Sequence, residues 1–253
     1  MSDANLKILT YNIHKGFSSM NRRFILHAIR EALRNVDADI IFLQEIHGER
    51  HIPGKQFDDW PSNSQFEFLA DSIWHHYAYG KNAIYRSGHH GNAILSKYPF
   101  IEWENIDVSL MKTASRSLLH GTVEVPGVSE KLHVICVHLG LFGIERTKQL
   151  STLVKRIDSH VPHDEPLIIA GDFNDWRGKA EHHLSHELGV SEVFRMAHGR
   201  YARTFPAWLP VLTMDRIYSR GLDVVSCEQL HGQPWRKLSD HIPLCAEFGA
   251  VGV

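Results

Sequence analysis

Acidic and amide side chains follow a run of core residues in the segment PLIIAGDFND, residues 166–175. The apolar run is typical of a buried strand, and Asp172, Asn174 and Asp175 come directly after it. Two carboxylates this close destabilise each other unless a positive group lies between them. The segment therefore predicts a site at which something cationic neutralises them.

Polar residues also stand at the ends of other strand-like runs. In four runs the last residue is polar, in the order Asn12, Glu45, His138 and Asp172. Two further runs begin with polar residues, namely Asp215 and the pair Asp240 and His241. If the first four strands leave the core at one edge and the last two enter there, all these side chains meet at that edge, which we call the mouth of the site. Any one position has the plain explanation that polar residues mark strand ends, but the set as a whole predicts a site.

The residue types in this set suggest one reaction class. Oxygen ligands from Asn12, Glu45 and Asp240 suit Mg²⁺, with Mn²⁺ as a substitute, and the absence of cysteine disfavours structural zinc. The histidines supply proton transfer and oxyanion stabilisation. Asp215 next to His241 would orient the imidazole and raise its pKa. We therefore expect hydrolysis of a phosphate ester by metal-assisted attack of water.

Short apolar runs alternate with amphipathic segments along the chain, and these must position the site. Strands are predicted at residues 6–12, 39–45, 76–80, 92–97, 116–125, 131–140, 166–172, 213–219, 223–230 and 242–248. Helices are predicted at residues 21–36, 144–159, 65–73 and 179–197. Many strands with few helices favour a mixed sheet over a doubly wound parallel one. Because no repeat or linker interrupts the chain, we expect a single domain over residues 1–253.

Composition limits the possible partners. The chain has 27 Lys and Arg against 29 Asp and Glu, a formal charge of −2, which argues against a dedicated DNA binder but leaves room for a local basic groove. No apolar run approaches the ~20 residues of a membrane helix, and no signal peptide opens the sequence, so we expect a cytoplasmic protein. Cys136, Cys227 and Cys245 are scattered and are expected to be free thiols.

Seven motifs in order carry a resemblance to a known family: TYNIH, LQE, GNAILSKYP, CVHLG, GDFND, MDRIY and SDHIPL. Together they resemble the endonuclease/exonuclease/phosphatase superfamily of DNase I-like fold, especially its small bacterial YbhP-type members. The motifs span Asn12 to Leu244, nearly the whole chain. The resemblance implies an α/β (α+β) fold, a four-layer sandwich of two packed mixed β-sheets flanked by helices. It also implies a metal-dependent phosphoric ester hydrolase of phosphodiesterase, nuclease or phosphatase type.

The resemblance implies roles at the metal and the phosphate. Glu45 matches the principal metal ligand of the family, with Asn12 beside it and Asp240 close enough to help. His138 matches the histidine that contacts the scissile phosphate.

The resemblance also implies roles around the attacking water. Asp172 and Asn174 match the pair that positions this water and a phosphate oxygen. Asp215 matches the aspartate that is hydrogen-bonded to the final histidine, His241. Either Asp172 or His241 serves as general base.

Five residues have two readings each. Arg116 could bind phosphate or form a structural salt bridge. Arg146 and Gln149 could buttress the site, but a solvated helix face is the plainer expectation. Trp208, in the loop TFPAWLP, could form a substrate rim or pack in the core. Asp175 is expected in a loop or at a helix cap.

The substrate stays open between several classes. Abasic-site nucleases of this superfamily carry a tyrosine where this chain has His90, which with the near-neutral charge disfavours a role in DNA repair. A phosphodiester in a small molecule or phospholipid headgroup is preferred. A sequence-tolerant DNA or RNA nuclease is one alternative, and a binding module without turnover is another. The intact set of site residues argues against the last, and peripheral membrane contact by WLPVL is left open.

Overall fold

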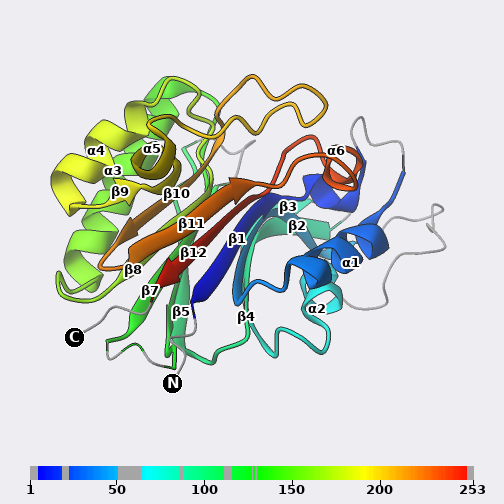
Figure 1. The fold of residues 1–253 in the computed structure, drawn as a ribbon, viewed down its shortest axis with the longest axis horizontal. Coiled ribbons are helices and arrows are strands. Elements are labelled where there is room, and N and C mark those ends of the chain that lie inside the picture. Colours follow the sequence, from blue (N-terminus) through cyan, green and yellow to red (C-terminus); the bar gives the residue numbers. More distant parts are fainter. Residues whose placement is uncertain are drawn as a thin grey trace.

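Two six-stranded β-sheets pack against each other with helices on their outer faces (Figure 1). The structure is a computed structural model that describes residues 5–18, 23–50, 64–85, 88–110, 116–126, 128 and 130–249. This arrangement confirms the expected four-layer sandwich of two mixed sheets. No helix in these ranges is long and apolar enough to cross a bilayer.

The first sheet has the strand order β11-β12-β1-β2-β4-β3. Its strands are β1 (Leu6–Asn12), β2 (Ile40–Arg50), β3 (His76–Tyr85), β4 (Gly88–Ser96), β11 (Asp223–Gln229) and β12 (Leu244–Gly249). Strands β1 and β2 are parallel, and β12 runs antiparallel to β1. The carboxyl ends of β1 and β2 therefore lie beside the start of β12.

The second sheet has the strand order β5-β6-β7-β8-β10-β9. Its strands are β5 (Phe100–Asp107), β6 (Ser117–Val123), β7 (Leu132–His138), β8 (Leu167–Asp172), β9 (Ser191–Glu192) and β10 (Asp215–Arg220). Strands β7 and β8 are parallel, which pairs His138 with Asp172. Strand β10 runs antiparallel to β8 and pairs Asp215 with the same Asp172.

Most helices cover the outer faces of the sheets, whereas Val193 and Phe194 of the helix Val193–His198 pack in the core between the sheets. The helices are the 3₁₀ helix η1 (His14–Gly16) and the α-helices α1 (Leu26–Val36), α2 (Gln65–Ala70), α3 (Gly143–His160), α4 (Lys179–Leu188), α5 (Val193–His198) and α6 (Trp235–Leu238). Apolar residues of α1, α2 and α6 pack with Leu9 of β1, and those of α3 and α4 pack with Ile135 of β7. Since successive strand residues point to opposite faces, a strand covered on both faces is apolar throughout.

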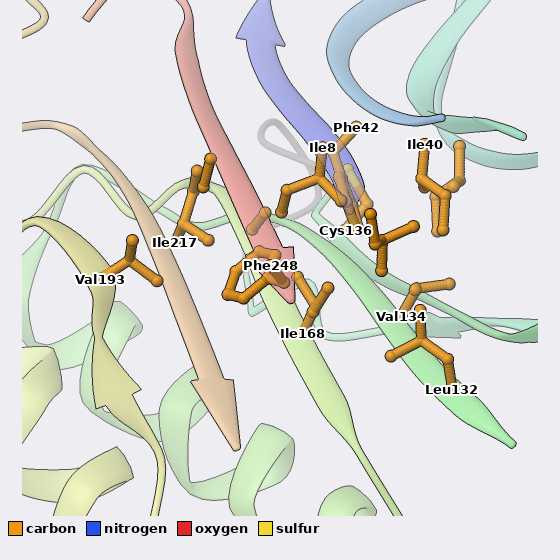
Figure 2. Close-up of a cluster of buried hydrophobic side chains, with 14 of the residues drawn as sticks. Ile8, Ile40, Phe42, Leu132, Val134, Cys136, Ile168, Val193, Ile217 and Phe248 are labelled. Carbon is orange, nitrogen blue, oxygen red and sulfur yellow. The ribbon is translucent and has the colours of Figure 1, made fainter. Parts of the chain in front are cut away.

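The core between the sheets joins residues far apart in sequence. Ile8 and Phe42 of the first sheet contact the same buried cluster as Val134, Cys136 and Ile168 of the second (Figure 2). Fully burying a side chain of this size stabilises the fold by about 1.5–3 kcal/mol. The three cysteines are free, as the sequence predicts.

The structure differs from the predicted elements most clearly at two helices and at one strand that was not predicted. The helix predicted at residues 179–197 is two helices, because Gly189 ends α4 in a left-handed conformation (φ 65°) before the short strand β9. The helix predicted at residues 21–36 begins at Leu26, while residues 21 and 22 lie outside the described ranges. Strand β5 was not predicted, because it lies at a sheet edge with most side chains exposed and shows no alternation.

Candidate active site at the ends of the central strands

The buried carboxylate of Asp172 is the centre of the site. Its Oδ2 accepts a hydrogen bond from Asn12 Nδ2 (3.1 Å), and its Oδ1 accepts one from the Asn174 backbone N–H (2.9 Å). Two imidazoles face the same Oδ2, with His138 Nε2 at 3.6 Å and His241 Nε2 at 3.9 Å. The two sheets thus bring four other predicted site residues around the two carboxylate oxygens of Asp172.

The backbone before and after Asp172 explains the sequence GDFN. Gly171 has φ 145°, and a Cβ there would lie 2.0 Å from the carbonyl oxygen of Val137 on β7. Only glycine lets β7 and β8 approach this closely. Asn174 adopts φ 50°, a left-handed conformation that Asn tolerates, and its Nδ2 donates to the Leu139 carbonyl (2.9 Å). Asn174 therefore ties the loop after β8 to the loop after β7.

Asp215 and His241 form a buried pair behind Asp172. His241 Nδ1 lies 2.8 Å from Asp215 Oδ2. The loop that precedes β10 holds this pair, because the backbone N–H of Asp215 donates to Thr204 Oγ1 (3.3 Å) and the Phe205 ring lies 5.0 Å from the imidazole. The predicted contact between Asp215 and His241 is present in the structure.

The two imidazoles have opposite protonation. Burial alone lowers the pKa of His241, but the Asp215 and Asp172 carboxylates outweigh it and raise that pKa to about 10. Burial, reinforced by the positive charges of Arg116 and His241, holds the pKa of His138 well below its usual value. Burial raises the pKa of Asp172 to about 7. At neutral pH a protonated His241 and a neutral His138 flank Asp172.

Glu45 lies at a bulge in β2. Between Leu43 and Ile46, three steps along β2 oppose two steps along β4, and Glu45 itself has φ 56°. A bulge redirects the side chain of the extra residue, and left-handed backbone in a residue with a Cβ is strain of the kind found at functional sites. Lys15 Nζ lies 3.7 Å from Glu45 Oε2. Thus Glu45 is half-buried, is partly balanced by a lysine and is near enough to His14 to act on the pKa of that imidazole.

The other two predicted metal ligands contact His14 of η1. Asn12 Oδ1 accepts a hydrogen bond from the His14 backbone N–H (3.1 Å), and Asp240 Oδ1 lies 2.8 Å from His14 Nδ1. The hydrogen bond to Asp240 raises the pKa of His14. Burial alone raises the pKa of Asp240, but His14 outweighs it and the net pKa is lowered. Sequence reasoning gave no role to His14 and Lys15, although they lie only two and three residues after Asn12.

Two sets of side chains can be tested as metal ligands. Asp172, Asp215 and His241 have ligand atoms within 4.8 Å of one another. In that set both nitrogens of the imidazole already face carboxylates, Nδ1 at 2.8 Å from Asp215 Oδ2 and Nε2 at 3.9 Å from Asp172 Oδ2, so a metal would have to displace the proton that this pairing holds. Asn12, Glu45 and Asp240 offer only oxygen, the donor set that Mg²⁺ and Mn²⁺ prefer. The donor chemistry of this second set fits the predicted cation.

The structure shows the contacts of two residues for which the sequence left two interpretations. Arg116 Nε donates to the Leu139 carbonyl (3.2 Å) and its charge acts on His138, so it lies beside the loop that follows His138. Asp175 Oδ2 accepts from the Ala180 backbone N–H (2.7 Å) in the first turn of α4, which confirms the predicted capping role.

Two of the plainer expectations were wrong. Arg146 and Gln149 are buried, not on a solvated helix face, because Arg146 donates to the Leu141 carbonyl (2.6 Å) and Gln149 accepts from the Gly140 N–H (2.8 Å). They hold the loop after His138. Trp208 does not pack in the core, since its side chain is 62% exposed.

His90 lies within electrostatic reach of the site. Burial lowers the pKa of His90 to about 4, and the charges of Lys15 and Glu45 act on it. It pairs with His47 of β2, next to the bulge that carries Glu45. The residue at which this chain departs from abasic-site nucleases therefore belongs to the surroundings of the predicted metal ligands.

Comparison with known proteins agrees with this geometry. The sequence pattern of the endonuclease/exonuclease/phosphatase family matches residues 9–241. The protein YbhP of Escherichia coli (strain K12) is 47% identical over 244 residues, which cover 96% of each chain. Among solved structures, the endonuclease/exonuclease/phosphatase from Beutenbergia cavernae DSM 12333 has a TM-score of 0.78 at 20% identity, covering 98% of this chain and 72% of that one. D. rerio TDP2 complexed with single strand DNA product has a TM-score of 0.71 at 22% identity, covering 98% of this chain and 100% of that one.

At these identities the solved structures establish the fold alone, whereas the family pattern and the relative in Escherichia coli establish the family. The sequence resemblance is thereby confirmed. The chain belongs to the endonuclease/exonuclease/phosphatase family, whose members are generally phosphoester hydrolases and usually use divalent metal ions.

Proposed function

We propose that this protein is a Mg²⁺-dependent phosphodiesterase that hydrolyses its substrate by direct attack of water. One observation carries the proposal: a buried carboxylate, Asp172, with its pKa raised to about 7, lies between a neutral His138 and a protonated His241. Groups of this kind, set apart in protonation by their environment, are suited to acid and base chemistry at neutral pH.

In this proposal each of the residues around Asp172 has a separate role. Asp172 accepts a proton from the attacking water, because a base is most effective when its pKa is close to the working pH. The protonated His241 donates a hydrogen bond to a phosphoryl oxygen and cannot itself act as base. Asp215 keeps His241 protonated and oriented, and Asn174 fixes Asp172 through its backbone N–H. His138 and Arg116 lie on the side where phosphate binds.

The metal ligands of the proposal are Glu45, Asn12 and Asp240. A bound Mg²⁺ would polarise the phosphoryl oxygen as a Lewis acid. In the structure Lys15 contacts Glu45 and His14 contacts Asp240, so these two side chains must release or share the carboxylates when a metal binds.

A small-molecule or phospholipid-headgroup diester is the preferred substrate, because the net charge of −2 gives long nucleic acids no general attraction. A nuclease is the second candidate, since the fold is shared with a protein solved with a single strand DNA product. Salt separates them: cleavage of long nucleic acid falls steeply with ionic strength, while hydrolysis of a small diester changes little.

The test compares wild type with Glu45→Gln on a chromogenic phosphodiester with Mg²⁺ or Mn²⁺ and with EDTA. We expect EDTA to abolish turnover, and Glu45→Gln to lower kcat/KM about a hundredfold and to weaken Mn²⁺ binding measured by calorimetry. Glu187→Gln, an exposed position on α4, is the matched control and keeps both properties.

Two outcomes would contradict the proposal. Unchanged Mn²⁺ binding and turnover in Glu45→Gln would remove Glu45 from the metal site. If metal-loaded wild type hydrolysed neither diesters, phospholipids nor nucleic acids, the protein would be a binding module.

A further inference from the structure

Large apolar side chains stand exposed on three loops around the mouth of the site. The most exposed of all those in the described ranges are Ile144 (80%), Phe142 (65%) and Trp208 (62%). Single exposed apolar residues are normal on a protein surface, but a group on neighbouring loops marks an interaction site. We call this group the apolar rim; it consists of Leu141, Phe142, Ile144, Trp176, Trp208 and Leu209.

Contacts between the loops make the rim one surface. The Arg146 guanidinium donates to the Leu141 carbonyl and lies 5.3 Å from the centre of the Trp176 ring, which joins the loops after β7 and β8. Arg216 donates to the carbonyls of Asp175 (2.8 Å) and Thr213 (2.6 Å), which joins the loop after β8 to the loop before β10.

The third loop is held directly against the site. The backbone N–H of Ala207 donates to the Asp240 carbonyl (2.7 Å), and Val211 N–H donates to the Phe205 carbonyl (3.0 Å). The loop is therefore closed on itself, and Trp208 and Leu209 protrude from its tip with more than half of each side chain exposed. In Figure 1 the loop between α5 and β10 lies along the same edge as α6.

Within the four described segments that carry or adjoin the rim, the exposed charges are all basic. The segments 139–149, 174–180, 204–214 and 230–241 are fully described, and their exposed charged side chains are Lys148, Arg177, Lys179, Arg236 and Lys237. Their acidic side chains are Glu145 and Asp175, which are buried, and Asp240, which is half-buried within the site. A molecule of net charge −2 thus presents a locally positive, apolar face around its catalytic groups.

We propose that the apolar rim and its basic border dock on the surface of an anionic phospholipid bilayer, and that the phosphodiester is presented from that surface. The docking stands on the rim alone, whereas the substrate class rests on the proposed function. Interfacial binding draws on both apolar insertion and attraction to anionic headgroups, and each Lys or Arg near an anionic surface contributes about 1 kcal/mol.

Two other occupants fit the rim less well. Nucleic acid gains from aromatic faces on which bases stack, but Leu141, Ile144 and Leu209 have no such face. A second copy bound face to face would place the same basic border against itself, and like charges repel across such an interface.

The test measures cosedimentation with vesicles of pure phosphatidylcholine or of an equal mixture with phosphatidylglycerol. We expect the wild type to partition into the mixed vesicles. Phe142→Ser/Ile144→Ser should weaken this partitioning about tenfold, because two inserted side chains are lost. Lys148→Gln/Lys237→Gln should weaken it at low salt, with the difference shrinking at high salt as the charges are screened.

The matched control is Ile101→Ser/Trp103→Ser, two exposed apolar residues on β5, which should bind like the wild type. Thermal unfolding checks that each variant is folded. Any of three results would overturn the docking. The wild type could fail to bind mixed vesicles, Phe142→Ser/Ile144→Ser could bind them as well as the wild type does, or the protein could bind single-stranded DNA in place of vesicles.

Hydrolysis of a soluble diester by the wild type keeps the two proposals separate. Turnover without vesicle binding overturns the docking and leaves the phosphodiesterase standing. Vesicle binding without turnover of any diester supports the docking and overturns the phosphodiesterase.

Discussion

Asp172 and His241 differ in what burial does to them. Both are buried, and burial favours the neutral form of each. For Asp172 the effect of burial dominates and raises the pKa to about 7. For His241 two neighbouring carboxylates outweigh burial and raise the pKa to about 10. The environment of each side chain, more than its type, sets its protonation state at neutral pH.

Asp215→Asn tests this balance. Without that carboxylate, only Asp172 and Asp240 still oppose burial, so we expect the pKa of His241 to fall well below about 10. NMR titration of the His241 Cε1 proton in the metal-free protein measures this pKa. We also expect turnover at neutral pH to fall about a hundredfold. Asp223→Asn, at the exposed start of β11, should leave both unchanged. An unaltered titration of His241 in Asp215→Asn would show that another group holds the proton.

The close approach of β7 and β8 brings His138 beside Asp172. Backbone pairing of parallel strands sets the register, but the approach at this point depends on Gly171. A larger residue there would push the strands apart and with them the two side chains.

Gly171→Ala tests this dependence. A Cβ would lie 2.0 Å from the Val137 carbonyl oxygen, so we expect the free energy of unfolding to fall by roughly 3 kcal/mol. Urea denaturation measures the change. Gly189→Ala is the matched control, because Gly189 also has positive φ (65°) but nothing within 4 Å of its Cβ position; it should cost only about 1 kcal/mol. Equal losses in the two variants would mean that backbone conformation alone, without the close approach, explains the glycine.

The stability of the whole molecule should vary with pH through Glu192. Burial raises the pKa of Glu192, which caps α5, from 4.5 to about 7. Between these values the folded state holds a proton that the unfolded state has lost. Because the folded state then binds more protons, stability falls as pH rises through this window and is constant on either side of it.

Glu192→Gln removes this titration while keeping an oxygen that can cap α5. We expect the wild type to lose about 3 kcal/mol relative to Glu192→Gln between pH 5 and 8. Urea denaturation of both proteins across this range gives the difference. A difference that stays constant with pH would show that the carboxyl group titrates normally in the fold.

Much of the fold could be predicted from the sequence, because local patterns carry it. The apolar runs of β1, β7 and β8 are long enough to predict strands buried on both faces. The helical spacing of apolar residues from Ile144 to Ser159 predicted α3. The edge strand β5 and the helix break at Gly189 were not predicted. An exposed strand shows no apolar pattern, and a glycine within a helical pattern can either continue the helix or end it.

The order of polar residues at strand ends predicted a meeting point only on the condition that the first four strands end where the last two begin. The strand directions meet that condition for Asn12, His138, Asp172, Asp215 and His241. Contacts and exposure needed the tertiary structure. Lys15 facing Glu45 and Trp208 facing solvent both depend on loops whose course is set by partners distant in sequence. The same holds for protonation, because burial and neighbouring charges exist only after the two sheets have packed.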